Sequence, residues 1–374
     1  ADETGYCPTF TWGAYDFSPG RGFLRDLRFQ RNQGAVFADE LERATDHIGL
    51  EKFDLVFCHT VGDFELIGWN RFLDRRRYSG RLAVLLRNTQ RFRTCHPIKR
   101  RFHPYWRLRP RFLNAIHARL GSRFTLVTDS KPLSADFSKV YRHRIVTFPI
   151  PVNRFLLNGT GPSDMEVERR FGIRPGPGVR VGYMGDARSA KGFHLLPAMV
   201  ERVLAASDRV RIVMQCPGAA SGPDNVPPAV GELSGQAQTW GPRLTLIGER
   251  LTEEDYAALF RYLDVVLIPY TSPSYAEATS GIFAEALALG KPVVVPTDTW
   301  MAQELGKTGG GVEFHRGDAS DLSAQVLHLV NNHERYAAAA AAGRHDWNRF
   351  HNADTLVDML LAEIGSRPFT PLEV

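Results

Sequence analysis

The sequence predicts an α/β protein with mostly parallel sheets, arranged as two successive domains. Short apolar runs alternate with segments whose apolar residues recur at helical spacing, which is typical of strands alternating with helices. The stretch from 157 to 178 is rich in glycine and proline and interrupts this alternation, which restarts after it. The length of 374 residues fits two domains, or three, at about 100–200 residues each.

Four short apolar runs in the first half are expected to be strands. They are residues 54–58, 82–86, 124–127 and 144–148. The last run leads into Pro149 and Pro151, which cannot continue a central strand because proline lacks the N–H that a ladder needs. The stretch from 91 to 111 mixes basic and aromatic residues without a clean period, so it is predicted to form a loop or short helices.

The second half repeats the alternation of strands and helices. Strands are expected at 179–184, 211–214, 244–247, 265–268 and 293–295, and helices at 165–171, 192–206, 281–289 and 353–364, with two more beginning near 252 and 321. Pro197 fits the helix at 192–206 only in its first turn. Tyr256 belongs to the apolar face of the helix that follows Thr252, and Gly290 with Pro292 ends the helix before the last strand.

Composition places the chain among globular proteins. The hydrophobic content of 43% is too high for a disordered chain, and no run of about 18 apolar residues exists, so no membrane-spanning helix is expected. Residues 1–4 lack the basic and apolar regions of a secretory signal peptide. The four cysteines are far apart and form neither a zinc spacing nor a CxxC pair, so reduced thiols in a cytoplasmic protein are expected.

Positive charge is concentrated in one part of the chain. The net charge is only +5, yet fourteen basic residues lie between Arg71 and Arg111, with Asp74 as the only acid. Such a stretch usually meets phosphates. With its interleaved aromatic residues it suits an anionic membrane interface, and a solvated arginine-rich surface is an alternative of equal weight. No recognisable nucleic-acid-binding motif accompanies the charge, so no nucleic-acid partner is expected.

The turn at residues 183–192 joins an expected strand to an expected helix. It carries Gly185 and Gly192, which let an anion approach the helix N-terminus, where N–H groups and the helix dipole favour negative charge. Arg188 and Lys191 add two cations, so the turn is equipped for a diphosphate. The alternative is a surface turn with two solvated cations, and this short motif alone does not decide between them.

A second element lies at residues 277–287, again between a strand and a helix. Ser280 and Gly281 suit the N-terminal cap and make a second helix N-terminus ready for an anion. Glu277 precedes the helix and Glu285 lies about two turns into it. If the helix is extended back to Glu277, the two side chains point in directions that differ by about 80°. Carboxylates beside a diphosphate make sense as acceptors for sugar hydroxyls; ordinary helix-surface charge is the alternative.

Together, these elements resemble the retaining nucleotide-sugar glycosyltransferases of the GT-B fold, especially glycosyltransferase family 4. The spacing of Glu277 and Glu285 matches the E-x7-E signature, the 185–192 turn is similar to the Lys-Gly phosphate motif, and residues 264–270 and 286–295 match the flanking strand and the usual continuation. Two departures stand out. Asp186 occupies the place where the family commonly has arginine, and residues 278–281 read Ala-Thr-Ser-Gly instead of containing Pro-Phe-Gly.

The resemblance implies a GT-B architecture of two Rossmann-like domains that face a cleft. Residues 1–160 would form the acceptor-binding domain and residues 161–348 the donor-binding domain. Residues 349–374 would form a C-terminal helix and tail that cross back to the first domain. The donor would be a nucleotide diphosphate sugar, with no tightly bound cofactor. No Asp-x-Asp motif lies at a strand end, so no metal is predicted.

The resemblance also implies roles for individual residues. Arg188 and Lys191 would bind the donor diphosphate and stabilise it as it departs, Glu277 would contact the donor sugar near the reacting centre, and Glu285 would hold the ribose hydroxyls. The remaining donor-binding residues would be Gly185, Tyr270, Tyr275, Ser280, Gly281 and Ile282, of which the last three would cradle phosphate with their backbone and the tyrosines would border the sugar. Residues 247–250 would lie near the base.

The acceptor side carries weaker signals. The family often places a histidine at the end of an inner strand of the first domain, where this chain offers Arg87 and Asn88, and His59 after another strand is a further candidate with a structural alternative. A retaining mechanism of the family's kind lets the leaving phosphate take the acceptor's proton, so it requires no protein base.

We therefore expect a hexosyltransferase-type enzyme that moves a sugar, with retention, to a saccharide or lipid-linked acceptor in polysaccharide biosynthesis. It would be cytoplasmic, with peripheral contact to the inner face of an anionic membrane through the basic span 71–111. Two rival interpretations remain: a sugar-nucleotide epimerase of the same fold, and a non-catalytic nucleotide-sugar-binding partner protein.

Overall fold

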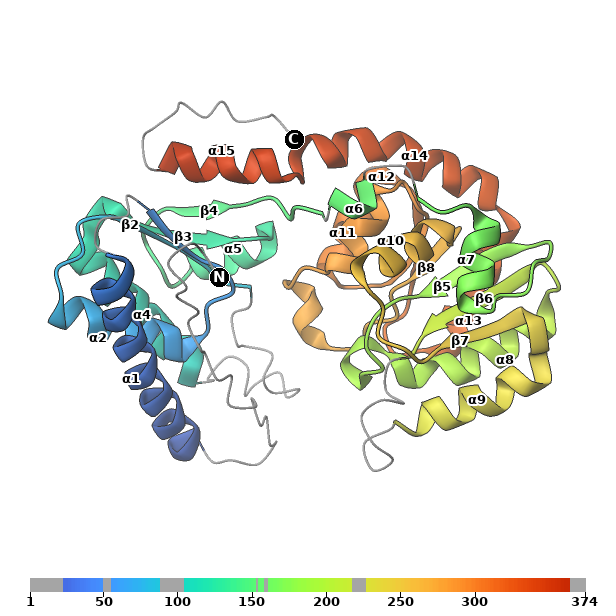
Figure 1. Ribbon diagram of the computed structural model, residues 1–374, viewed down its shortest axis with the longest axis horizontal. Coiled ribbons are helices and arrows are strands. Elements are labelled where there is room, and N and C mark those ends of the chain that lie inside the picture. The colour runs from blue at the N-terminus through green and yellow to red at the C-terminus, as the bar shows by residue number, and fades with distance from the viewer. Residues whose placement is uncertain are drawn as a thin grey trace. The chain divides into compact units, whose positions relative to one another are not determined.

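The structure is a computed structural model that describes residues 23–49, 55–87, 104–152, 154–157, 161–216 and 227–363 (Figure 1). The described chain divides into two compact units. The first runs up to Phe148 and includes the end of the last helix from Asp358, and the second runs from Pro149 to Val357. Each unit has one sheet whose described strands are all parallel.

The first unit is built on a sheet in the order β1-β2-β3-β4. The strands are β1 (Leu55–Cys58), β2 (Arg81–Leu85), β3 (Phe124–Thr128) and β4 (Ile145–Thr147), and the helices are α1 (Phe23–Ile48), α2 (Asp63–Arg75), α4 (Pro104–Leu120) and α5 (Lys131–Ser138), with a short 3-10 turn η3 (Gly121–Arg123). All four strands expected from the sequence are present. The sheet buries a core whose largest side chains include Trp69, Tyr141 and Phe72.

Helix α1 is not among the elements expected from the sequence. It packs against α2, and the two approach closely at a pair of glycines: a methyl group on Gly34 would lie 2.7 Å from the side chain of Ile67, and one on Gly68 would lie 2.6 Å from Phe37. Gln30 is also buried. Glycine and glutamine thus stand at buried positions of this helix, where the period expects apolar residues.

Helix α4 corrects the expectation that residues 91–111 form a loop or short helices. The part from 91 to 103 lies outside the described residues, but a 17-residue helix begins at Pro104. Arg109 in this helix is buried, because its Nε donates to Asp63 Oδ1 at 2.7 Å and both side chains are only 2% exposed. A charged residue therefore faces the core at a position where periodicity expects an apolar one.

Acids from elsewhere in the chain neutralise part of the basic span. Arg75 binds Asp39 and Glu42 of α1 at 2.9 Å each, and Arg76 binds Asp46 at 3.0 Å. Further along the span, Arg87 and Arg109 are also paired with carboxylates. The excess of positive charge that the sequence shows in this span is therefore smaller in the folded unit. The carboxylates that reduce it stand about 30 to 46 residues away in the sequence from the arginines they bind.

The second unit holds a six-stranded sheet in the order β10-β9-β8-β5-β6-β7. The strands are β5 (Val179–Tyr183), β6 (Val210–Gln215), β7 (Leu244–Ile247), β8 (Val265–Leu267), β9 (Val293–Pro296) and β10 (Gly311–Phe314). The first five were expected from the sequence. β10 was not, because it is short and starts with a glycine. From the middle of the sheet, β5, β6 and β7 follow one another towards one edge, and β8, β9 and β10 follow one another towards the other. The sheet is therefore doubly wound, and its strand order reverses between β5 and β8.

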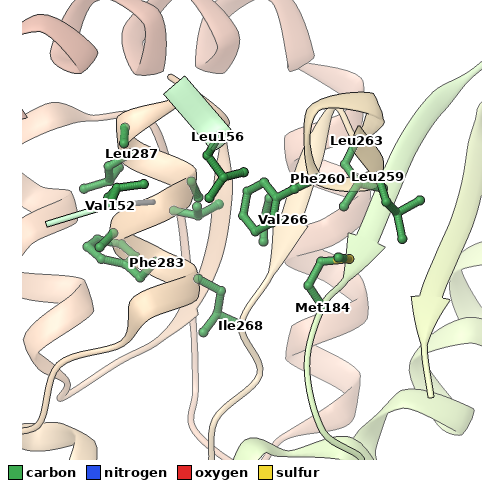
Figure 2. Close-up of a cluster of buried hydrophobic side chains, with 14 of the residues drawn as sticks. Val152, Leu156, Met184, Leu259, Phe260, Leu263, Val266, Ile268, Phe283 and Leu287 are labelled. Atoms are coloured by element: carbon green, nitrogen blue, oxygen red, sulfur yellow. The ribbon is translucent and has the colours of Figure 1, made fainter. Parts of the chain in front are cut away.

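Helices cover both faces of this sheet. One face packs against α8 (Leu196–Ala206), α9 (Pro228–Trp240) and α13 (Ala319–Asn331), and the other against α10 (Glu253–Tyr262), α11 (Gly281–Ala288) and α12 (Trp300–Thr308), with α14 (His333–Phe350) contributing to both. Figure 2 shows the buried side chains on the second of these faces, with Phe260 and Val266 in the middle and Phe283 to their left. The core thus holds the ends of β5 and β8 and the start of α11 in fixed positions.

Three details differ from the expected elements or refine them. The helix expected from residue 192 begins only at Leu196, after two 3-10 turns, η4 (Ser189–Lys191) and η5 (Phe193–Leu195), and Pro197 lies in its first turn as expected. The glycine-rich stretch after α6 (Arg154–Leu157) contains α7 (Asp164–Phe171), whose Val167 is buried in the core of the second unit. The last described helix, α15 (Ala353–Glu363), matches the expected one and is divided between the units at Asp358.

Candidate functional site

The reversal of strand order between β5 and β8 defines where a ligand is expected. In open α/β sheets, ligands bind outside the carboxyl ends of the strands at such a switch point, because the connections leave in opposite directions there. The 185–192 turn follows β5, residues 268–272 follow β8, and a short 3-10 turn, η9 (Pro273–Ala276), leads from there towards α11. Both sequence motifs therefore start at this edge of the sheet.

The 185–192 turn is held in place by its backbone. Gly185 has φ +119° and donates its N–H to Gln215 Oε1 at the end of β6, at 2.9 Å. Ala190 accepts N–H groups of Thr271 and Ser272 at 3.1 and 3.2 Å, so the turn is pinned to the chain after β8. Gly192 has φ +73°, and a methyl group there would lie 1.6 Å from the carbonyl oxygen of Pro269. Only glycine fits at this contact.

The two cations of the turn share one counter-ion. Arg188 Nη2 lies 3.0 Å from Asp186 Oδ2, and Lys191 Nζ lies 3.8 Å from the same oxygen. Arg188 is exposed, whereas the Lys191 side chain is only 14% exposed. Burial lowers the pKa of the Lys191 ammonium, and Asp186 acts in the opposite direction. Asp186, which departs from the family pattern, is thus an anion close to the proposed phosphate-binding cations.

The N-terminus of α11 forms the second part of the site. Ser280 caps the helix by accepting the N–H of Phe283 at 3.3 Å, and its hydroxyl donates to the Tyr270 hydroxyl at 3.3 Å. The rings of Tyr270 and Tyr275 lie 4.3 Å apart between centroids. No acidic residue occupies the first turn of α11, so its N–H groups, including that of Ile282, retain their preference for an anion.

The two motifs meet at Gly185. A methyl group on Gly185 would lie 3.0 Å from Lys191 Nζ and 3.1 Å from Ile282 Cδ1, so the turn, its lysine and the first turn of α11 are neighbours. Lys191 is also close enough to Glu285 to favour the ionised form of that carboxyl. The sequence placed these residues in two separate motifs, and the fold brings them together in one place.

The two carboxylates of the E-x7-E motif have different surroundings. Glu285 is partly buried, and burial raises its pKa to about 7, while the Tyr256 hydroxyl, which donates to Oε2 at 2.6 Å, and Lys191 both lower it. Glu277 follows η9, is 2% exposed, and donates its N–H to the Ser274 carbonyl at 3.2 Å. Glu285 is thus poised between ionised and neutral near neutral pH.

The candidate acceptor residues lie in the first unit, after neighbouring strands. His59 follows β1, is exposed, and its Nδ1 lies 3.1 Å from Thr60 Oγ1. Arg87 follows β2 and donates from Nε to the buried carboxylate of Asp129 at 2.7 Å. Asn88 lies outside the described residues. Asp129, which sequence reasoning did not single out, follows β3 and anchors Arg87 at the carboxyl edge of this sheet.

Two residues of the donor side were missed from the sequence. Gln215, which holds Gly185, stands one residue beyond the strand expected at 211–214. Tyr256, which holds Glu285, was assigned to an apolar helix face. Polar groups at strand ends and tyrosines on buried faces are both common, so neither position carried a local signal for its partner. Their roles depend on residues 30 and 29 positions away.

The expected base-binding region is also partly paired within the protein. Glu249, in the 247–250 segment, forms an exposed ion pair with Arg170 of α7 at 3.1 Å.

Across the described residues, no helix combines the length and apolar character needed to cross a membrane. Nor do three or more histidine, cysteine, aspartate or glutamate side chains gather in a metal-binding group anywhere in the described ranges.

Comparison with solved structures defines the class of fold. The chain is similar to HepE from Anabaena in complex with UDP (TM-score 0.62, 19% identity, covering 89% of this chain and 82% of that one). It is also similar to an α,α-trehalose-phosphate synthase (UDP-forming) from Burkholderia vietnamiensis (0.67, 14%, 93% and 81%) and to sucrose-phosphate synthase from Thermosynechococcus elongatus (0.61, 15%, 88% and 77%). The expected GT-B fold of two Rossmann-like domains is confirmed.

A segment of the second unit matches a known sequence family. Residues 178–332 match the family described as Glycosyl transferases group 1, and this segment contains both the 185–192 turn and the E-x7-E motif. The resemblance to glycosyltransferases that those motifs predict is therefore confirmed. No curated protein matches the sequence.

Proposed function

We propose that this protein is a glycosyltransferase that takes a sugar from a nucleotide diphosphate donor bound at the carboxyl edge of the second sheet. The observation that carries the proposal is the convergence of Gly185, Lys191 and the N-terminus of α11 beside Glu285. The family match of residues 178–332 supports it. The HepE structures in complex with UDP and with UDP-glucose, and the description of the Burkholderia vietnamiensis synthase as UDP-forming, support a donor of this kind.

The chemistry of glycosyl transfer suits this arrangement. Breaking the bond between sugar and diphosphate develops negative charge on the departing phosphate, and preorganised donors in a partly dry site stabilise it by several kcal/mol. Lys191, Arg188 and the N–H groups of residues 280–282 would supply that stabilisation. Gly185 lets the phosphate approach the backbone, Glu285 would accept the ribose hydroxyls, and Glu277 would contact the donor sugar, which Tyr270 and Tyr275 border.

The proposal extends to the acceptor. Residues 1–160 would bind a saccharide or lipid-linked acceptor with His59, Arg87 and Asn88 nearby, residues 161–348 the donor, and residues 349–374 would return to the first domain. Transfer of a hexosyl group with retention, in polysaccharide biosynthesis, is the family-based expectation. Peripheral contact of a cytoplasmic protein with an anionic membrane through the basic 71–111 span belongs to the same expectation, although Arg75, Arg76 and Arg109 of that span are paired with acids.

Nucleotide binding tests the donor site. Calorimetry with UDP, ADP and GDP should detect binding of at least one of them, and Lys191→Ala should weaken it by about tenfold or more, since a charge-assisted bond is worth about 1.5–3 kcal/mol. Lys307→Ala removes an exposed lysine that pairs with Glu304 on α12, so it is a matched control and should bind like the wild type. Equal affinity of Lys191→Ala and the wild type would remove Lys191 from the site.

Product formation tests the reaction. With a UDP-sugar and a saccharide or lipid-linked acceptor, the wild type should form a new glycoside, and Glu277→Gln should lower turnover more than nucleotide affinity. An altered sugar nucleotide formed without any acceptor would establish the epimerase instead. Nucleotide binding without any product across a panel of acceptors would favour the non-catalytic partner protein.

A further inference from the structure

Tyr256 contacts the carboxylate that is expected to hold the ribose. It lies on α10, whereas Glu285 lies on α11, and its hydroxyl donates to Glu285 Oε2 at 2.6 Å. This distance is short, as expected for a hydrogen bond to an ionised acceptor. The Tyr256 ring packs against Phe260 one turn further along α10, with centroids 5.7 Å apart, so the position of the hydroxyl is set by the core.

One tyrosine hydroxyl leaves most of the capacity of a carboxylate unused. A carboxylate offers about four lone-pair sites on two oxygens. The hydrogen bond from Tyr256 to Oε2 restricts rotation of the carboxylate, and its remaining lone pairs can accept hydroxyl groups. We propose that Tyr256 is a positioning residue that orients Glu285 and keeps it ionised, so that Glu285 accepts the vicinal ribose hydroxyls of the donor. This inference rests on the proposed function.

The charges around Glu285 make this role measurable through pH. Three described groups interact with the carboxyl: Tyr256 from α10, Lys191 from η4, and Tyr270 from the chain after β8. Burial raises the pKa of Glu285, Tyr256 and Lys191 lower it, and the balance leaves it at about 7, so the hydrogen bond from Tyr256 favours the ionised form at neutral pH. Removing that donor raises the pKa further, and a protonated Glu285 is a poorer acceptor for the diol.

The test compares UDP with 2′,3′-dideoxy-UDP by calorimetry between pH 6 and 9. The ratio of the two affinities isolates the contribution of the ribose hydroxyls, because the diphosphate and its own titration are common to both ligands. In the wild type we expect UDP to bind about tenfold or more tightly than the dideoxy ligand. In Tyr256→Phe this preference should fall towards one at pH 7 and recover as the pH is raised, while affinity for dideoxy-UDP stays unchanged.

Helix α10 offers a matched control. Tyr262 on the same helix donates to a different carboxylate, Glu168 of α7, at 2.9 Å, so Tyr262→Phe removes the same kind of bond elsewhere. It should keep the wild-type preference at every pH. Glu285→Gln should lose the preference without recovering it at high pH.

Three results would contradict the inference or its basis. If Tyr256→Phe keeps the wild-type ratio throughout, or loses affinity for both ligands equally, Tyr256 does not position a ribose acceptor. If the wild type binds UDP without preferring it over the dideoxy form, Glu285 does not hold the diol, although the donor site stands. If the folded wild type binds none of UDP, ADP and GDP, the proposed function itself fails.

Discussion

Replacing Gly192 by alanine probes the contact that positions the phosphate turn. An alanine Cβ at this position would lie 1.6 Å from the Pro269 carbonyl oxygen, whereas such contacts hardly ever fall below 3.0 Å, so the two segments must separate by about 1.4 Å. The left-handed backbone at φ +73° adds a cost of about 1–2 kcal/mol for a residue with a Cβ. Forcing the packed segments apart adds about 1–3 kcal/mol.

Gly309 provides the control for the backbone cost alone. It ends α12 with φ +66° and ψ 8°, close to the +73° and 16° of Gly192, but a methyl group there would meet nothing within 4 Å. Gly309→Ala should therefore lower the free energy of unfolding by only about 1–2 kcal/mol. Gly192→Ala should lower it by about 2–5 kcal/mol, from the sum of both effects.

Urea unfolding and calorimetry measure the two consequences. Gly192→Ala should unfold at clearly lower urea concentration than Gly309→Ala, with a similar slope. It should also bind UDP at least about tenfold more weakly, because a shift of about 1 Å displaces Lys191 from its position. If the two variants lose equal stability, or if Gly192→Ala binds UDP like the wild type, the contact with Pro269 does not set the geometry of the turn.

Two further predictions concern charged and titrating groups elsewhere. Arg109→Ala leaves the buried Asp63 carboxylate without its partner at 2.7 Å and should lower the free energy of unfolding by about 3–5 kcal/mol, measured by urea unfolding. Arg75→Ala, which removes an exposed ion pair, should change it little. Equal effects of the two substitutions would contradict the importance of the buried pair. His351 accepts the N–H of Ile150 at 3.0 Å, and burial lowers its pKa from 6.5 to about 3. Between these values the unfolded chain binds a proton at His351 that the folded chain does not bind, so the free energy of unfolding should fall as the pH drops from 6.5 towards 3. It should fall less steeply in His351→Gln. Identical pH profiles of the two proteins would show that His351 does not titrate in this way.

Local patterns in the sequence determined most of the secondary structure and the positions of both motifs. The buried strands are short apolar runs, and Ser280, Gly290 and Pro197 mark helix boundaries through properties that act over a few residues. Because strands alternate with helices in a doubly wound sheet, placing each motif after a strand already placed it at the carboxyl edge. The family resemblance of the donor half followed from these local features.

The tertiary structure alone decided which charges are paired and which polar groups meet. The basic span 71–111 contains almost no acid in the sequence, yet in the fold Arg75 and Arg109 have carboxylate partners on other helices. Likewise, the hydroxyl of Tyr256 reaches Glu285 and the Pro269 carbonyl excludes any side chain at Gly192, although nothing near these residues in the sequence indicates it. Propensity and periodicity act between neighbours a few residues apart, whereas ion pairing, burial and close backbone contact depend on segments that only the packed fold brings together.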